Sequence, residues 1–187
     1  MNTLISLHNS VFARLSALAD PWLLPTLARF AFAAVLWIYF WNSAGTKLGD
    51  GWLGFLQPSA GAYAQVFPRA MDAAGFNTDN LGIYHWAVTA LGMWAEFLLP
   101  LLIVLGLLTR LAALGMIGFV ALQSMTDLYG HGGIADQETL GAWFDRYPDG
   151  LILDQRLFWV TILLILLIKG AGPASLDWLF GRMTRPD

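Results

Sequence analysis

The stretch that decides the fold is residues 98–118, LLPLLIVLGLLTRLAALGMIG. Its only polar side chains, those of Thr109 and Arg110, separate two apolar runs that continue in both directions along the chain. A helix needs about 20 mainly apolar residues to cross a bilayer. A break of two residues leaves room only for a tight helix–helix connection. The stretch therefore predicts two neighbouring antiparallel helices inside a membrane.

Outward from this turn, four stretches are apolar enough to span a bilayer, at about residues 24–44, 84–108, 111–126 and 151–169. The third is the shortest, so it must stand nearly upright or extend into its flanks, given a rise of about 1.5 Å per residue. Charged residues make up only 12% of the 187, against about 25% in soluble proteins. The predicted fold class is all-α, an integral membrane four-helix bundle in which residues 1–187 form a single domain.

The distribution of cations predicts the orientation of the bundle. Four spans place both termini and the Thr109–Arg110 turn on one side of the membrane. That side carries six of the ten Lys and Arg residues: Arg14, Arg29, Arg110, Lys169, Arg182 and Arg185. Because cytoplasmic segments near span ends are enriched in Lys and Arg, we expect the N- and C-termini to be cytoplasmic.

Aromatic side chains are concentrated in the two segments predicted to lie outside, residues 49–83 and 127–150. These segments contain more large apolar side chains than a protein usually leaves exposed to water. Among them are Trp52, Phe55, Tyr63, Phe67 and Trp143. We therefore expect short helices that form an ordered outer cap over the mouth of the bundle. On the opposite side, apolar residues at helical spacing between Leu4 and Leu18 predict an interfacial helix, and Ser175 is placed to cap a second short helix.

The composition excludes several classes of chemistry. The chain has no cysteine, so disulfides, thiolate catalysis and iron–sulfur clusters held by cysteine are excluded. A net charge of −3 and the lack of a basic run argue against nucleic-acid binding. No nucleophile–base pair or glycine-rich phosphate loop is present, so no catalytic residue is identified. A redox role would require a bound cofactor or quinone.

Glu96 is the first candidate functional residue, because it lies near the centre of the second predicted span. A carboxylate at that depth is costly unless it is paired, hydrated or protonated. Arg29, early in the first span, is the expected partner in an intramembrane charge pair. The pair has two interpretations: a functional centre around Glu96, or an ion pair that only fixes the register of the helices.

A group of residues near the outer boundary forms the second candidate site, for a quinone, another ligand or a partner. Lys47 lies at the polar exit of the first span, and Asp127 ends the third span at the same level. The same boundary contains Tyr84, His85 and His131. Lysines and aromatic residues are common at membrane boundaries without any function. The histidine spacing has no metal-ligand signature, so no metal site is predicted, whereas an apolar slot with a few polar contacts suits a quinone.

Several short motifs, in order along the chain, resemble the DoxX family of small four-helix bacterial membrane proteins. They are Arg29, the Gly45-Thr46-Lys47-Leu48 exit of the first span, Glu96, residues 105–113 (LGLLTRLAA) and residues 170–177 (GAGPASLD). The resemblance implies a membrane subunit in a bacterial inner membrane with a link to quinones or redox partners. The long outer loops lie beyond the shared core, so a function placed there is particular to this chain.

Three functions are consistent with these residues. The first is a DoxX-like inner-membrane subunit of a quinone-linked redox complex, which binds a quinone or a redox partner rather than catalysing alone. The second is a non-catalytic interaction or assembly protein whose outer loops dock a partner. The third is a small transporter, which would need a homo-oligomer because four spans leave little room for a pathway. The expected partners are the lipid bilayer and either another protein or a second copy of the chain.

Overall fold

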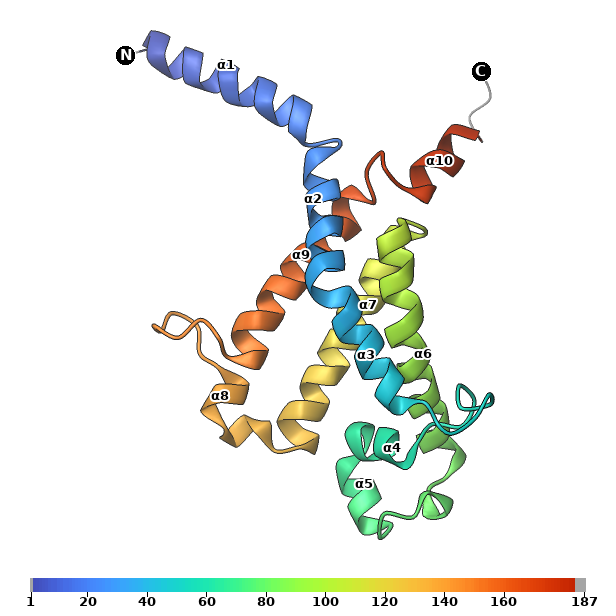
Figure 1. The fold of residues 1–187 in the computed structure, drawn as a ribbon. Helices are drawn as coiled ribbons and strands as arrows, with labels where there is room; N and C mark the ends of the chain where they lie inside the picture. The colour runs from blue at the N-terminus through green and yellow to red at the C-terminus, as the bar shows by residue number, and fades with distance from the viewer. Residues whose placement is uncertain (1, 184–187) are drawn as a thin grey trace.

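The computed structural model describes residues 2–183 and is helical, with no strand among these residues. Four helical segments are long and apolar enough to cross a membrane: Leu23–Lys47, Ile83–Leu105, Thr109–Gly130 and Leu151–Lys169. They form the predicted four-helix membrane bundle (Figure 1). Arg185, which contributed to the orientation argument, lies outside the described residues.

The first span is one helical rod made of α2 (Leu23–Phe32), a π-helical turn η1 (Ala33–Trp37) and α3 (Ile38–Lys47). It extends three residues beyond the predicted end at residue 44, because the polar run after Trp41 continues the helix as far as Lys47. Because of this extension, the Lys47 side chain lies inside the bundle. The sequence had predicted it at the outer boundary of the first span.

The second and third spans are α6 (Ile83–Leu105) and α7 (Thr109–Met125), the latter continued by the π turn η3 (Thr126–Gly130). Helix α6 ends earlier than predicted because Gly106 adopts a left-handed conformation (φ 66°), which terminates helices. The third span is longer than predicted at both ends, so its length no longer requires an upright orientation. The fourth span consists of η5 (Leu151–Gln155) and α9 (Arg156–Lys169).

The core of the bundle joins the first, third and fourth spans along most of their length. Helix α9 packs against both α2 and α7, while α6 packs against α3 and α7. The largest fully buried side chains include Phe32, Leu36, Phe40, Met116 and Leu163. Because most of the remaining span surface is exposed and apolar, the outside of the bundle is suited to lipid.

We call the end of the bundle with the α6–α7 turn the tail end, since the first and last helices that the structure describes lie there (Figure 1). The predicted N-terminal helix is α1 (Asn2–Ala19), which extends away from the bundle with its apolar side chains exposed. Helix α10 (Leu176–Met183) begins as predicted, with the Trp178 amide donating to the Ser175 hydroxyl (3.2 Å).

At the tail end the chain is fastened by a cluster that we call the tail clamp: Arg29, Gly106 and Asp177. Arg29 donates to the carbonyl oxygens of Ala171 (3.1 Å) and Ala174. The Asp177 carboxylate accepts from the amides of Leu108 (2.7 Å), which precedes α7, and Thr109 (2.9 Å), its first residue. A Cβ at Gly106 would collide with Arg29, so only glycine allows this approach.

The opposite end, the cap end, carries two short helices that we call the cap: α4 (Ala60–Val66) and α5 (Pro68–Ala73). Ser59 caps α4 by accepting from the Ala62 amide (3.2 Å), and Pro68 occupies the first turn of α5, where its missing N–H is tolerated. Helix α4 packs on α3 and α6. Burial there raises the pKa of the Tyr63 hydroxyl. The 3₁₀ turns η2 (Thr78–Asn80) and η4 (Gly133–Ala135) and helix α8 (Gln137–Leu140) complete this end.

The loop aromatics were expected to pack on the bundle mouth or on a partner, and three of the five do not pack on the mouth. Tyr63 is buried and Phe67 half-buried, but Trp52, Phe55 and Trp143 are 83%, 47% and 56% exposed. The loop before the cap is instead fastened through its backbone. Indole N–H groups on α6 donate to the carbonyls of Phe55 (2.7 Å) and Leu56 (2.9 Å), and the loop's own rings point outward.

Candidate functional site

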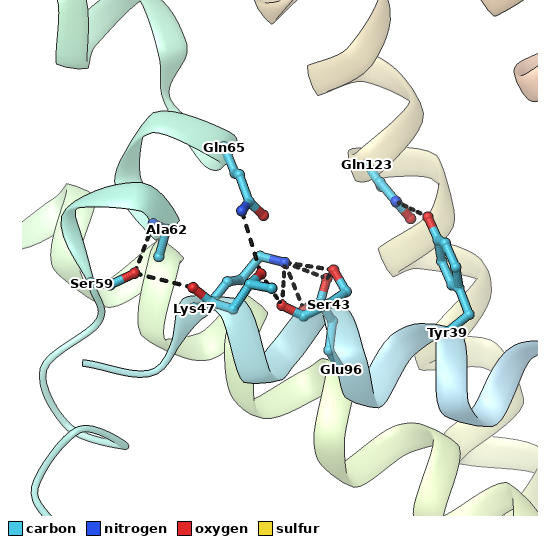
Figure 2. Close-up of polar contacts among 9 residues, drawn as sticks. Tyr39, Ser43, Lys47, Ser59, Ala62, Gln65, Glu96 and Gln123 are labelled. Atoms are coloured by element: carbon cyan, nitrogen blue, oxygen red, sulfur yellow. Dashed lines mark hydrogen bonds and ion pairs between the residues drawn. The ribbon is translucent and has the colours of Figure 1, made fainter. Parts of the chain in front are cut away.

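A buried ion pair joins α3 to α6 close to the cap end. The Lys47 ammonium lies 2.8 Å and 3.0 Å from the two carboxylate oxygens of Glu96, and the two residues are 6% and 2% exposed (Figure 2). Lys47 also donates to the Ser43 hydroxyl (2.8 Å), which itself donates to Glu96 (3.2 Å). Charges buried at this depth persist only when they are paired and hydrogen-bonded. Each charge of this pair is neutralised and bonded within the chain.

The predicted pairing of Glu96 with Arg29 is therefore wrong. Glu96 lies beside Ser43, fourteen residues after Arg29 on the same helical rod. At about 1.5 Å per residue, that separation is about 20 Å along the axis, beyond the reach of an arginine side chain. Arg29 bonds the tail of the chain instead. Glu96 thus lies within the span predicted for it, but it faces a different turn of the neighbouring helix than predicted.

A second, partly buried ion pair joins the third span to the fourth. Asp127 in η3 pairs with Arg156 at the start of α9, and Arg156 also donates to the Ser124 hydroxyl (2.7 Å). Arg156 is 3% exposed. Arg156 is not among the candidate residues predicted from the sequence. The order of the spans could have identified Arg156. The fourth span begins at the end of the bundle where the third span ends, so Arg156 and Asp127 lie at the same level.

The pocket between the second and third spans brings part of the predicted outer cluster together. This cap-end pocket has a volume of about 840 Å³. One wall comes from α6: Val88, Leu91, Gly92, Ala95, Glu96 and Leu99. The other comes from the third span: Gly115, Gly118, Phe119, Ala121, Leu122, Gln123, Thr126 and Asp127. Ser43 and Lys47 from α3, Gln65 and Val66 from the cap, and His131 complete the lining.

The pocket exists because α6 and α7 diverge from their shared turn toward the cap end (Figure 1). A Cβ at Gly115 would meet the Leu99 side chain at 3.1 Å, so the helices are close there. At Gly118 and Gly92, nearer the cap, a Cβ would meet nothing within 4 Å. Small residues in both walls thus leave space that larger side chains would fill.

The pocket opens sideways toward the bilayer. Leu91 on α6 and Leu122 on α7 both line it, yet they are 60% and 67% exposed on membrane-spanning helices. A rim formed by such residues faces lipid rather than the bundle interior. A lipophilic molecule in the membrane therefore has direct access to the pocket.

The predicted histidine and tyrosine sites separate in the structure. His131 lines the pocket, and its Nε2 lies 2.9 Å from the backbone oxygen of Gln65. His85 and Tyr84 do not line it. The His85 ring packs edge-on against Phe67 (4.9 Å between centroids), and Tyr84 is 65% exposed. Within residues 2–183 no group of three His, Asp or Glu residues is arranged to hold a metal.

Comparisons with models of protein families, with curated proteins and with solved structures gave no match. The function must therefore be inferred from the pocket and from the groups that line it.

Proposed function

We propose that the chain is a DoxX-like subunit of a quinone-linked redox complex in a bacterial inner membrane, and that it binds a quinone in the cap-end pocket. The observation that carries this proposal is an apolar pocket of about 840 Å³, open to lipid, with polar groups gathered in one part of its wall. Electrons would come from a partner protein, because the chain has no cysteine and therefore no thiol redox group of its own.

The size and polarity of the pocket favour a ligand of this kind. Sites for small molecules and cofactors have volumes of about 300–1,000 Å³ and mostly apolar walls with a few placed polar groups. The charges at the wall occur as two ion pairs, Lys47 with Glu96 and Asp127 with Arg156. Because each pair is neutral, the site favours an uncharged headgroup over a phosphate or a metal ion. A quinone has an uncharged polar ring on an apolar tail.

The resemblance to the DoxX family supports the redox part of the proposal. Two of its motif residues, Lys47 and Glu96, are the partners of the pocket ion pair. Two others, Arg29 and Asp177, belong to the tail clamp. The resembling positions thus include both an element of the pocket lining and a structural one.

Quinone content after purification tests the proposal. Gly118→Leu should fill the pocket without a steric clash, since nothing lies within 4 Å of the added Cβ. Gly45→Leu is the matched control, because Gly45 also has open space around it but does not line the pocket. Organic extraction should release quinone from the wild type and from Gly45→Leu, and at least about tenfold less from Gly118→Leu. Absence of quinone from every sample, or equal amounts in both variants, contradicts the proposal.

We further propose that the tail end faces the cytoplasm, from the excess of Lys and Arg on that side. The cysteine-free chain allows a direct test. A cysteine introduced by Thr78→Cys should react with a membrane-impermeant thiol reagent in intact cells, whereas one introduced by Ser10→Cys should react only after the cells are opened. The reverse labelling pattern overturns this orientation.

Exposed aromatic side chains at the cap end favour a second candidate function, docking of a partner protein. Phe144 is fully exposed with φ 65°, and Trp52 is 83% exposed. Under this alternative, replacing both by alanine would abolish co-purification of a membrane partner and leave the quinone content of the remaining protein unchanged. Under the leading proposal alone, partner recovery would not depend on these rings.

A further inference from the structure

One wall residue of the cap-end pocket has unused hydrogen-bonding capacity. Among residues 2–183, six buried side-chain nitrogen or oxygen atoms have no hydrogen-bond partner: Trp37 Nε1, His85 Nδ1, Thr89 Oγ1, Thr109 Oγ1, Gln123 Oε1 and Arg156 Nε. Of these residues only Gln123 lines the pocket. Its amide nitrogen donates to the Tyr39 hydroxyl (3.2 Å), and its carbonyl oxygen remains buried without a donor (Figure 2). A buried acceptor without a donor is costly, so the site is complete only when a ligand supplies one.

The polar groups on α3 extend this arrangement along the pocket. Tyr39, Ser43 and Lys47 are spaced four residues apart and therefore lie on one face of α3. Tyr39, which contacts Gln123, lies about 6 Å deeper along the axis of α3 than Ser43, which contacts Glu96.

The Glu96 carboxylate, which lies about one helical turn closer to the cap than the Gln123 carbonyl oxygen, is also a hydrogen-bond acceptor. Glu96 Oε1 accepts from both Lys47 and Ser43, but Oε2 accepts only from Lys47. A carboxylate oxygen can accept more than one hydrogen bond, so Oε2 retains capacity for a further donor. By contrast, the three donor hydrogens of Lys47 have acceptors in Glu96 and Ser43. Among the charged and carbonyl groups at this end of the pocket, the free hydrogen-bonding capacity therefore belongs to two acceptors on facing walls, Gln123 Oε1 and Glu96 Oε2.

We infer that the pocket selects the reduced, hydroxyl-bearing form of its ligand, a quinol, with one hydroxyl donating to Gln123 and the other to Glu96. This inference rests on the proposed quinone site. A quinone ring presents two carbonyl oxygens and can only accept hydrogen bonds, so it leaves Gln123 Oε1 without a donor. A quinol ring presents two O–H donors and satisfies both acceptors. Sites with a buried polar group reject analogues that leave the group unpaired.

A comparison of the two redox forms of one short-chain benzoquinone tests this selectivity. Binding of the quinone and of its reduced quinol is measured separately by calorimetry, in detergent and without oxygen. We expect the quinol to bind at least about tenfold more tightly to the wild type. Gln123→Met, which keeps the side-chain length but removes the acceptor, should abolish this preference and change quinone affinity by less than about twofold.

Two further variants make the test specific. Gln123→Glu retains only acceptor oxygens, to which the Tyr39 hydroxyl can donate, and should keep the preference for the quinol. Gln65→Leu changes another glutamine of the pocket lining and should also keep it. Equal affinity of the wild type for the two forms, or tighter binding of the quinone, overturns the inference and leaves the proposed quinone site intact. Binding of neither form overturns both.

Discussion

At the tail end of the bundle, Arg29 and Asp177 bond backbone groups of other segments, whereas at the cap end Lys47 and Glu96 bond each other in the wall of a pocket. The tail clamp joins the first span, the α6–α7 turn and the C-terminal segment. Its charged side chains form their hydrogen bonds to the backbone and so hold these segments together. The cap-end pair lies where α6 and α7 have moved apart and a lipophilic molecule can enter.

The difference separates the structural use of buried polar groups from their use in a site. Bonds to backbone amides and carbonyls fix where a segment lies, and they leave no capacity for a ligand. Two ion pairs beside an apolar pocket keep a polar surface inside the membrane without net charge. We therefore expect changes at the tail clamp to affect stability alone. Changes in the pocket wall should affect ligand binding, and also stability where they leave a buried charge unpaired.

The largest effect is expected for Lys47→Met, which leaves the Glu96 carboxylate buried without its partner. Removing one member of a buried pair destabilises proteins by about 3–5 kcal/mol. The double variant with Lys47→Met and Glu96→Leu should recover most of that loss, because no unpaired charge remains. Denaturant or thermal unfolding in detergent measures both. A single variant as stable as the wild type would show that the pair is not buried as described.

A smaller effect is expected for Asp177→Ala at the tail clamp. The change removes the acceptor of two backbone amides at the start of α7 and should lower the free energy of unfolding by about 1–2 kcal/mol. Quinone content per folded protein should not change, because Asp177 does not line the pocket. Loss of the quinone from protein that remains folded would remove the distinction between the two ends.

The smallest effect is expected for Trp52→Ala, in a cap-end loop outside the pocket. Its side chain is 83% exposed, and surface substitutions of this kind change stability by less than about 0.5 kcal/mol. Unfolding and quinone content should both match the wild type. A fall in quinone content would extend the site to this loop.

The sequence was sufficient for the number of spans and for the fold class, because runs of apolar residues determine both. It also identified Glu96 and Lys47 as residues of interest, since charged groups are rare in spans. It failed to pair them, because pairing depends on the vertical register of two helices, and a shift of a few turns changes the partner from Lys47 to Arg29. The role of Arg156 and the divergence of α6 from α7 depend on packing between spans distant in sequence, which no local pattern records.

Photolabelling tests the central claim, that the cap-end pocket holds the ligand, most directly. A photoreactive quinone is bound to the purified protein in detergent, irradiated, and its attachment sites are mapped by peptide mass spectrometry. We expect labels on residues 88–99 of α6 and 115–126 of the third span, reduced by competing quinone and absent from Gly118→Leu. Labels confined to the tail end, at residues 105–111 or 170–178, would contradict it.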